Sequence, residues 1–207
     1  MDTNQERDEP QAEPSSSQPK TSIFTGFDAY CPQLVRAKER VTALLRHESY
    51  GVILAGRPGT GKTHLAKIVA HRLAQRASYQ TEDGLLDAIR ATFTPGGGSA
   101  EDILGRIRRA EYVIIEDVGV GYVRDESLEW LQGIYWKILD QRFEKGLPVM
   151  LTSNLKLGDL MVRIGPRAAS RLTALLLHNT KRTEQITDNA NYVDLFAVRD
   201  HRQTGGL

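Results

Sequence analysis

A glycine-rich segment at residues 56–63 limits the fold of this chain more than any other feature. It reads GRPGTGKT and satisfies the pattern G-x-x-x-x-G-K-[ST]. An apolar run at 52–55 comes before it, and apolar residues at helical spacing, from Leu65 to Leu73, come after it. Glycines let backbone N–H groups turn inward around an anion, and the positive end of the following helix points at the same anion. The segment therefore predicts a strand, a phosphate-binding loop and a helix.

The loop also predicts which residues contact the phosphates. Lys62 should reach the β- and γ-phosphates of a nucleotide, and the Thr63 hydroxyl should ligate Mg²⁺. His64 follows directly, although a single histidine on a helix more often packs or faces solvent than binds a ligand. The predicted nucleotide-binding residues are Gly56, Arg57, Pro58, Gly59, Thr60, Gly61, Lys62, Thr63 and His64.

The rest of the chain alternates between helical and strand patterns. Apolar residues at helical spacing predict helices at 34–45, 65–73, 85–93, 100–107 and 126–143. Short apolar runs predict strands at 52–55, 112–115 and 149–152, and 77–80 is a weaker candidate. Ser99, followed by Asp102, resembles a capping box that opens the fourth helix. This alternation predicts an α/β fold with a largely parallel sheet, covered on both faces, whose ligand lies at the carboxyl ends of the strands.

The strand predicted at 112–115 runs directly into two acids, Glu116 and Asp117, in the sequence YVIIEDVGVG. Adjacent carboxylates repel each other and resist burial, so the pair indicates a metal site, a group that activates water, or a strand end at the surface. The phosphate-binding loop favours the first two interpretations. Phosphoryl transfer needs one carboxylate that holds Mg²⁺ and a second group that orients the attacking water.

The composition restricts the partners and the compartment. The 207 residues fit one domain, and 27 Lys and Arg against 26 Asp and Glu give a net charge of +1. This near-zero net charge does not indicate that the protein as a whole attracts nucleic acid, although it allows a local basic patch. The single cysteine, Cys31, cannot form an internal disulfide and fits a reducing cytoplasm. There is no apolar run of about 18 residues, so we expect a cytoplasmic protein with no membrane partner.

The two ends of the chain differ from its middle. Residues 1–22 are rich in Pro, Ser, Gln and Glu and contain no large aliphatic residue after Met1. Such a segment cannot bury enough apolar surface to offset the entropy of ordering it. We therefore expect a disordered tail at 1–22, a folded domain at 23–198 and a flexible C-terminus at 199–207.

Five segments, in this order, carry a family resemblance: GVILAGRPGTGKTHLA, LLDAIRATF, RRAEYVIIEDVGVG, GLPVMLTSNL and IGPRAASRL. Over residues 24–193 the chain resembles the ATPase domain of bacterial replicative-helicase loaders of the DnaC/DnaI type. These loaders belong to the initiator clade of AAA+ ATPases, together with DnaA and the transposition helper IstB. The resemblance implies a three-layer P-loop NTPase core with a mainly parallel five-stranded sheet. The short tail after Arg171 implies that there is no helical lid domain.

The resemblance also implies a role for each polar residue at the strand ends. Residues 56–63 match the Walker A loop, Glu116 matches the Walker B acid that binds Mg²⁺ through water, and Asp117 matches the catalytic acid. Asn154 matches the sensor 1 residue that contacts the γ-phosphate or the attacking water. Arg171 matches the arginine finger that reaches the ATP of an adjacent subunit, and Arg167 lies one helical turn before it as a second trans-acting candidate.

In this clade the helices between the second and third strands line the route of single-stranded DNA. Here that region is 83–109, which offers Arg90 and Arg106 for backbone phosphates, with Arg108 and Arg109 nearby. Phe93 and Tyr122 are the candidates for stacking against bases. The apolar pattern of the helix assigns Phe93 equally well to the hydrophobic core.

The resemblance implies an ATPase with ATP and Mg²⁺ as cofactors, slow alone and stimulated by DNA or oligomerisation. Its expected partners are other copies of itself, single-stranded DNA and a replicative helicase, which it loads during DNA replication. One alternative is an IstB-like transposition helper that binds duplex DNA. Another alternative is an ATP-dependent switch that acts on a protein partner without binding DNA, which the near-neutral charge also allows.

Two departures from the family pattern bear on these expectations. The family usually places Asp before the catalytic acid, whereas this chain has Glu116 and then Asp117, so the geometry of the metal and the water should differ. Helicase loaders also carry a helicase-grasping domain before the ATPase core. Only about 22 residues precede the core in this sequence, so its contact with a helicase is not visible.

Overall fold

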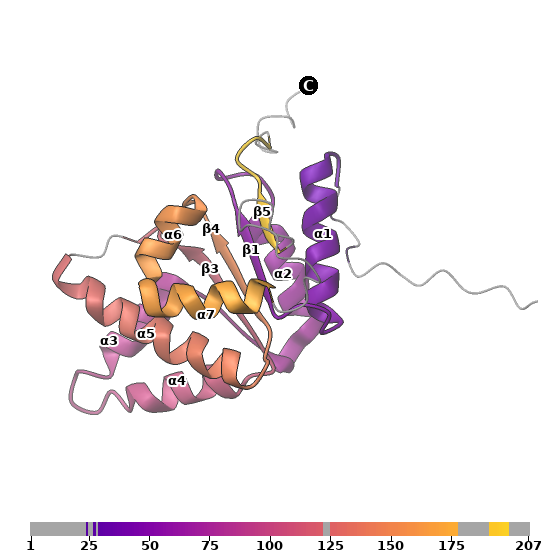
Figure 1. The fold of residues 1–207 in the computed structure, drawn as a ribbon. Coiled ribbons are helices and arrows are strands. Elements are labelled where there is room, and N and C mark those ends of the chain that lie inside the picture. Colours follow the sequence, from indigo (N-terminus) through magenta and orange to yellow (C-terminus); the bar gives the residue numbers. More distant parts are fainter. Residues whose placement is uncertain (1–23, 25–26, 28, 122–124, 178–190, 199–207) are drawn as a thin grey trace, which may run out of the picture.

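A five-stranded sheet, in which all neighbouring strands pair in parallel, separates two layers of helices (Figure 1). The computed structural model describes residues 24, 27, 29–121, 125–177 and 191–198. The strands are β1 (Gly51–Ala55), β2 (Ala77–Thr81), β3 (Tyr112–Val118), β4 (Val149–Ser153) and β5 (Tyr192–Asp194). The three-layer α/β fold predicted from the sequence is thus confirmed.

Seven α-helices and one short 3₁₀ helix are found in the part of the chain that is described. They are α1 (Pro32–Leu45), α2 (Lys62–Leu73), η1 (Ala74–Arg76), α3 (Glu82–Ala91), α4 (Ala100–Arg109), α5 (Asp125–Glu144), α6 (Leu157–Ile164) and α7 (Pro166–Leu177). Within these residues, no helix is both long and apolar enough to cross a lipid bilayer. No helical lid domain follows α7 in the described ranges, where only β5 remains.

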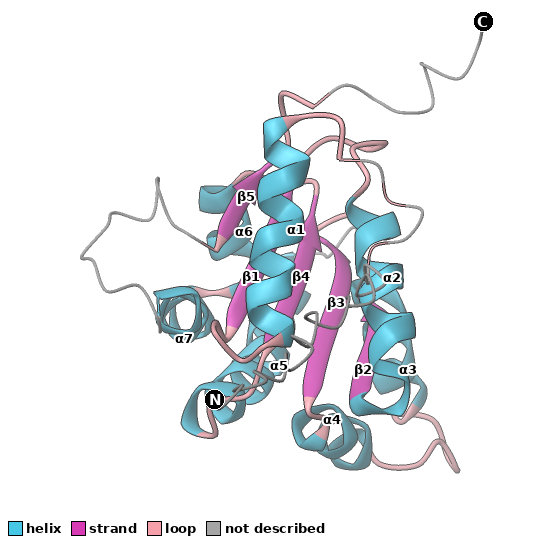
Figure 2. Ribbon diagram, turned by 90° about the vertical axis from the view of Figure 1, so that its right-hand side faces the viewer, coloured by secondary structure: helices cyan, strands magenta, loops and turns pink. Residues whose placement is uncertain are grey.

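Each face of the sheet has its own apolar core, because successive side chains of a strand point to opposite faces. Val52 and Leu54 of β1 pack with α1 and α2, whereas Ile53 of the same strand packs with residues of α3 to α7. Figure 2 shows α1 lying in front of the strands on the first of these faces. A strand whose two faces are both covered needs a continuous apolar sequence, which β1 has.

The order of the strands in the sheet is β2-β3-β4-β1-β5. Because β4 lies between β3 and β1, the carboxyl ends of these three strands are neighbours at one edge of the sheet. The loop at 56–63, the acid pair and Asn154 all lie at that edge, which is where a parallel α/β sheet binds its ligand. The strand order therefore brings together residues that are about 100 positions apart in the sequence.

The predicted helices and strands are present, with three differences. The helix expected to reach Phe93 ends at Ala91, where the Thr92 hydroxyl donates to the Ile89 carbonyl (2.7 Å). The sequence patterns did not locate α6, α7 or β5, which have eight, twelve and three residues. The strand predicted at 112–115 extends to Val118, so the acid pair lies within β3 and not after it.

The predicted capping box at Ser99 is wrong. Ser99 occupies the N-cap position of α4, but its side chain makes no capping hydrogen bond. The neighbouring helix α3 is capped instead, because the Thr81 hydroxyl accepts a hydrogen bond from the Gly84 N–H (3.1 Å). The disordered tail predicted at 1–22 and the flexible C-terminus predicted at 199–207 lie outside the described residues.

Arg142 of α5 holds the amino-terminal end of the sheet together from a fully buried position (0% exposed). Its guanidinium donates to the carbonyls of Ala110 (2.5 Å), Glu111 (2.5 Å) and Pro148 (2.6 Å). Burial lowers its pKa to about 10. The segments that enter β3 and β4 are therefore tied to α5 by one side chain.

We predict that Arg142→Ala destabilises the protein severely, because it removes the donor from the Ala110 and Glu111 carbonyls and leaves the Pro148 carbonyl with the Val113 N–H as its remaining donor. Each buried unsatisfied group costs about 1–3 kcal/mol, so the free energy of unfolding should fall by at least about 2 kcal/mol in urea denaturation. Arg76→Ala is the control, because Arg76 is largely exposed, where it pairs with Glu111 and lies over the Tyr112 ring. An equal change in both variants would contradict the structural role of Arg142.

Candidate nucleotide-binding and catalytic site

The loop between β1 and α2 adopts the conformation that its glycines permit. Gly59 (φ +83°) and Gly61 (φ +89°) lie in the left-handed region, where residues with a Cβ are strained. Gly61 is the N-cap of α2 and has no side chain to cap it. The first N–H groups of α2 therefore face the concave side of the loop without a side-chain acceptor from the N-cap residue, which is the arrangement that binds phosphate.

Lys62 places its ammonium group inside this turn. It is only 4% exposed, and its Nζ donates to the carbonyls of Gly56 (2.7 Å) and Arg57 (2.9 Å). The Thr60 hydroxyl donates to the same Arg57 carbonyl (2.9 Å), which closes the turn. A buried cation beside the uncapped amino terminus of a helix attracts an anion, so the loop can bind the phosphates of a nucleotide.

Two apolar segments enclose the loop from outside. The ring of Phe27 stacks on His64, with centroids 5.8 Å apart and 16° between the planes. Leu195, just after β5, lies so close to Gly56 that a Cβ there would approach the Leu195 Cβ to 2.7 Å. His64 was predicted as a nucleotide contact, and the structure shows its ring stacked on Phe27. Sequence patterns gave no signal for Phe27 or Leu195.

A β-bulge in β3 determines the direction in which the side chains of Glu116 and Asp117 point. The pairing of β3 with β4 is regular up to Ile115 and resumes at Val118, so Glu116 and Asp117 lie opposite the single residue Thr152. Ile115 and Val118 both pack in the core that contains α3 to α7. In a regular strand, residues three apart would face opposite sides. The bulge therefore turns both acids away from that core and toward the face that carries α2.

Asp117 adopts a strained conformation that the neighbouring strand holds in place. Its φ of +55° is in the left-handed region, which costs a residue with a Cβ about 1 kcal/mol or more. Its N–H donates to the hydroxyl of Thr152 in β4 (3.0 Å). Because strain of this kind persists only where surrounding contacts fix it, the bulge is a built feature of β3.

Glu116 is a buried carboxylate (2% exposed) beside the phosphate loop. Its Oε2 accepts a hydrogen bond from the hydroxyl of Tyr79 in β2, whereas its buried Oε1 has no hydrogen-bond partner among the described residues. Burial raises the pKa of Glu116, and Asp117 raises it further, while Tyr79, Thr63 and Lys67 lower it. Oε1 of Glu116 is therefore available to bind a cation.

Asn154 follows β4 at the same edge of the sheet. Its Oδ1 is buried and has no hydrogen-bond partner in the described ranges. The preceding residue, Ser153, donates from its hydroxyl to the Val118 carbonyl (2.6 Å), which ties the end of β4 to the end of β3. Asn154 is therefore held close to the acid pair with one polar atom available for a ligand.

These residues fit Mg²⁺ that arrives together with a nucleotide. In the described part of the chain, no group of three or more His, Cys, Asp or Glu residues could hold a metal by itself. Mg²⁺ is usually bound through one or two carboxylates together with substrate phosphates and waters. Glu116 offers one open carboxylate oxygen, and the Thr63 hydroxyl lies close enough to lower its pKa.

A buried ion pair clamps the loop that leaves β3. Glu82, the first residue of α3, is 1% exposed and accepts hydrogen bonds from the Gly119 N–H (3.0 Å), Tyr135 (2.8 Å) and Arg163 of α6 (2.6 Å). Arg163 also donates to the Gly121 carbonyl (2.9 Å). The helices that follow β2 and β4 thus hold the loop after the acids from both sides.

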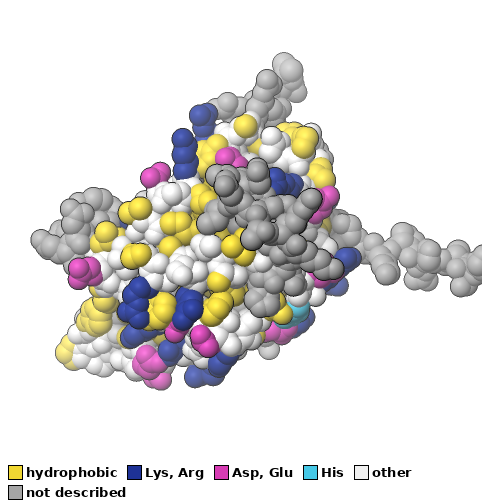
Figure 3. Space-filling view, in the orientation of Figure 1, with side chains coloured by type: hydrophobic (Ala, Val, Ile, Leu, Met, Phe, Trp, Pro, Cys, Tyr) yellow, Lys and Arg dark blue, Asp and Glu magenta, His cyan; other side chains and the backbone are white. Residues whose placement is uncertain are grey.

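The two arginines of α7 lie against α5, and both guanidinium groups lie over the Trp136 ring. Arg171 donates from Nε to Asp140 (2.8 Å), and its guanidinium lies 4.6 Å from the Phe143 ring centroid. Arg167 is exposed and lies 4.0 Å from the Trp136 ring centroid. Figure 3 shows this face, where basic, acidic and hydrophobic side chains gather over α5 and α7.

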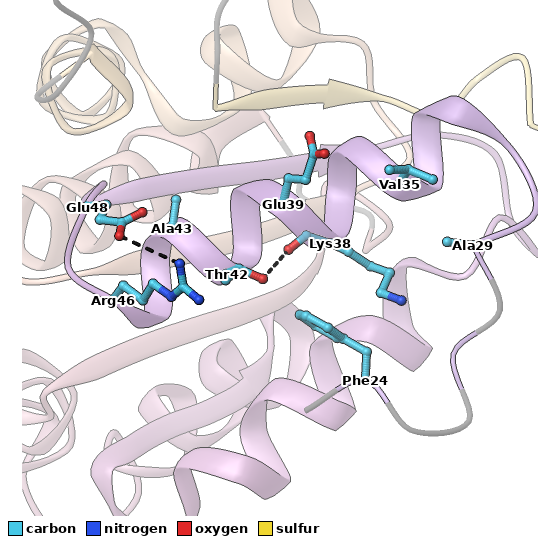
Figure 4. Close-up of a pocket in the computed structure, with 9 residues that line it drawn as sticks. All are labelled: Phe24, Ala29, Val35, Lys38, Glu39, Thr42, Ala43, Arg46 and Glu48. Carbon is cyan, nitrogen blue, oxygen red and sulfur yellow. Dashed lines mark hydrogen bonds and ion pairs between the residues drawn. The ribbon is translucent and has the colours of Figure 1, made fainter. Parts of the chain in front are cut away.

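Beside Arg167, a pocket of about 370 Å³ lies between α5 and the α6–α7 junction. It is lined by Glu129, Gln132, Gly133, Trp136, Ile164, Gly165, Pro166, Arg167 and Ala168. A larger hollow of about 430 Å³ runs along α1 (Figure 4), where Lys38 lies over the Phe24 ring and Arg46 pairs with Glu48. None of the residues that line the α1 hollow belongs to the phosphate loop, the acid pair or the α7 arginines.

Only some of the residues that were predicted to contact DNA lie close to one another. Phe93 is 67% exposed, which excludes its assignment to the core, and its ring meets Trp130 of α5 edge-on at 6.1 Å. The Arg90 guanidinium lies over the same Trp130 ring at 5.6 Å. Arg106 and Arg109 are exposed on α4, whereas Arg108 pairs with Glu101. Tyr122 lies outside the described residues.

The sheet order, the phosphate loop after β1, the acids in β3 and the polar residue after β4 define a P-loop domain of the AAA+ class. Residues 36–191, well over half of the chain, match the family described as IstB-like ATP binding protein. The chain belongs to this family. The resemblance to the initiator clade is thus confirmed, while the roles of individual residues stay predictions. Among curated protein sequences, none matches this chain.

Solved structures share the fold at low sequence identity. The DnaC helicase loader has a TM-score of 0.58 at 20% identity, with 74% of this chain and 92% of that chain covered. DnaI has a TM-score of 0.60 at 19% identity, with 73% and 86% covered. The replication initiator DnaA bound to AMPPCP and single-stranded DNA has a TM-score of 0.59 at 20% identity, with 75% and 48% covered. The chain thus spans about half the length of that DnaA.

Proposed function

We propose that this chain binds and hydrolyses ATP as a helicase-loader-like AAA+ protein that oligomerises with ATP and engages single-stranded DNA in DNA replication. The observation that carries the ATPase proposal is the bulge in β3, which turns Glu116 and Asp117 together toward the face of α2. A structural strand end would not need two carboxylates on one buried face. The proposed partners are other copies of the chain, single-stranded DNA and a replicative helicase.

Each residue of the site has a task in this proposal. The backbone N–H groups of the loop and the Lys62 ammonium hold the phosphates, and Glu116 and Thr63 hold Mg²⁺, which neutralises phosphate charge when it is bound. Asp117 accepts a proton from the attacking water, and Asn154 orients that water or the γ-phosphate. The tasks of Asp117 and Asn154 need them at one edge of the sheet, where the strand order places them.

The family match favours a second candidate function, an IstB-like transposition helper that binds duplex DNA. The two candidates share the ATP site and differ in the nucleic acid that they bind. DNA binding measured in ATP with matched single-stranded and duplex oligonucleotides separates them. Preference for the single strand supports the loader-like proposal, and preference for the duplex supports the transposition helper.

We predict that Asp117→Asn retains ATP and loses its hydrolysis, because an amide cannot accept the proton from the attacking water. Turnover should fall by about 10²–10⁴-fold, and the affinity for a fluorescent ATP analogue should stay within a few-fold of the parent. The exposed Asp87→Asn is the matched control. If hydrolysis survives in Asp117→Asn and is lost in Glu116→Gln with nucleotide still bound, the two roles are reversed.

We predict that Arg171→Ala binds ATP normally and loses stimulated hydrolysis, because a trans-acting guanidinium of this kind contributes about 10³–10⁵ in rate. Turnover per subunit should rise with protein concentration in the parent and stay flat in the variant. Mixing Arg171→Ala with Asp117→Asn subunits should restore turnover, since each supplies the group that the other lacks. Equal stimulated turnover in Arg171→Ala, the parent and the exposed control Arg46→Ala would contradict a trans role.

We predict that Trp130→Ala and Phe93→Ala each weaken single-stranded DNA binding by about 5–100-fold at matched salt, since stacking of one base is worth about 1–3 kcal/mol. Fluorescence anisotropy with a labelled oligonucleotide in ATP measures the effect. Val162→Ala is the control, because it removes an exposed apolar side chain from α6. Unchanged affinity in both aromatic variants would remove this cluster from the DNA surface.

A further inference from the structure

Tyr79 is a titratable side chain next to the acid pair to which sequence patterns assigned no role. It lies in β2, the strand beside β3, and packs against the core that contains α1 and α2. Its hydroxyl donates a hydrogen bond to Oε2 of Glu116. An ionised carboxylate can only accept, so the Tyr79 hydroxyl is the donor that holds this oxygen.

The hydrogen bond separates the two oxygens of the Glu116 carboxylate. Oε2 is occupied by Tyr79, and Oε1 is buried without a hydrogen-bond partner among the residues described. A buried carboxylate oxygen without a partner is costly, and such an oxygen in a native site marks the place of a ligand or a catalytic role. Oε1 is therefore the oxygen of the Glu116 carboxylate that remains available for a ligand.

Glu116 needs such an anchor because of its length. A glutamate has one more rotatable bond than an aspartate, so its carboxylate loses more conformational freedom when it is held in one orientation. Asp117 is held through its own backbone by Thr152, which does not restrain the Glu116 side chain. Tyr79 supplies this restraint by donating to Oε2 of the Glu116 carboxylate, and the Thr63 hydroxyl also lies close to the same carboxylate.

We propose that Tyr79 is a positioning residue that fixes the rotation of the Glu116 carboxylate, so that Oε1 serves the divalent cation bound with the nucleotide beside Thr63. The inference rests on the proposed ATPase function and deepens it. Outer hydrogen-bond partners of a metal ligand orient it, and their removal typically weakens metal binding by about 10–100-fold. Tyr79 acts through Glu116 and does not itself contact the phosphates in this proposal.

The test uses the full chain with Mn²⁺ as the probe for the cation site and AMPPCP as the nucleotide. Tyr79→Phe removes the hydroxyl and keeps the ring packing. We expect about 10–100-fold weaker Mn²⁺ binding by electron paramagnetic resonance in the presence of AMPPCP, with unchanged AMPPCP affinity in EDTA. Turnover at low Mg²⁺ should fall in parallel and recover at high Mg²⁺.

Tyr112→Phe is the matched control, because Tyr112 opens β3 at the opposite end from the acids. Its hydroxyl donates to the Leu45 carbonyl (3.2 Å) and lies 2.8 Å from His47, away from the site. This variant should lose some stability and keep the Mn²⁺ affinity of the parent. If Mn²⁺ binding weakens in both Tyr79→Phe and Tyr112→Phe, the loss follows from removing any tyrosine hydroxyl from β2 or β3. That result would overturn the proposal.

A double-mutant cycle with Glu116→Asp tests whether the effect passes through Glu116. The shorter aspartate withdraws the carboxylate from Tyr79, so Tyr79→Phe should have little further effect on Mn²⁺ affinity in that background. Equal effects of Tyr79→Phe in the two backgrounds, or parent-like Mn²⁺ affinity in Tyr79→Phe, would overturn the role of Tyr79 while leaving the ATPase proposal intact. A parent protein that binds neither AMPPCP nor Mn²⁺ would overturn both.

Discussion

The extra residue in β3 is the constraint on which the whole site depends. Without the bulge, Glu116 and Asp117 would alternate, and one of the two carboxylates would point into the core that contains α3 to α7. Burying an unpaired carboxylate among Ile115, Val118 and their neighbours would be far more costly than the strained backbone of Asp117. The bulge thus solves the problem that two adjacent acids pose, because it allows both to face the phosphate loop.

Buried polar contacts hold this irregular geometry from several directions. Thr152 accepts the Asp117 N–H, Tyr79 donates to Glu116, and the pair of Glu82 and Arg163 clamps the loop that follows. Glu82 begins α3, whose other end carries Arg90 and is followed by Phe93. The helix that presents the candidate DNA surface is therefore hydrogen-bonded directly to the loop after the acid pair.

Much of the fold could be predicted because its signals are local. The phosphate loop needs glycines and a lysine at fixed spacing, and the long amphipathic helices repeat their apolar residues over several turns. In contrast, β5 has only three residues and takes its register from β1, so its existence depends on contacts between distant segments. The Ser99 prediction was wrong because residue type permits a capping bond without requiring one.

The residues of the candidate site also differ in whether the sequence could predict them. Lys62, Thr63 and the acid pair follow from patterns, and the roles of Asn154 and Arg171 were inferred from resemblance. The residues that surround the site and the candidate DNA surface could not be predicted, because Tyr79, Glu82 and Trp130 are ordinary strand or helix residues in the sequence. Only the strand order and the packing of α3, α5 and α6 bring them to the site.

In the proposed mechanism, one bulge turns both acids toward the bound nucleotide. A crystal structure of the chain with AMPPCP and Mg²⁺ tests it most directly. We predict that the Glu116 carboxylate lies beside the metal and the Asp117 carboxylate beside the γ-phosphate, with Tyr79 still bonded to Glu116. Regular pairing of β3 with β4, with Asp117 directed into the core of α3 to α7, would contradict the account.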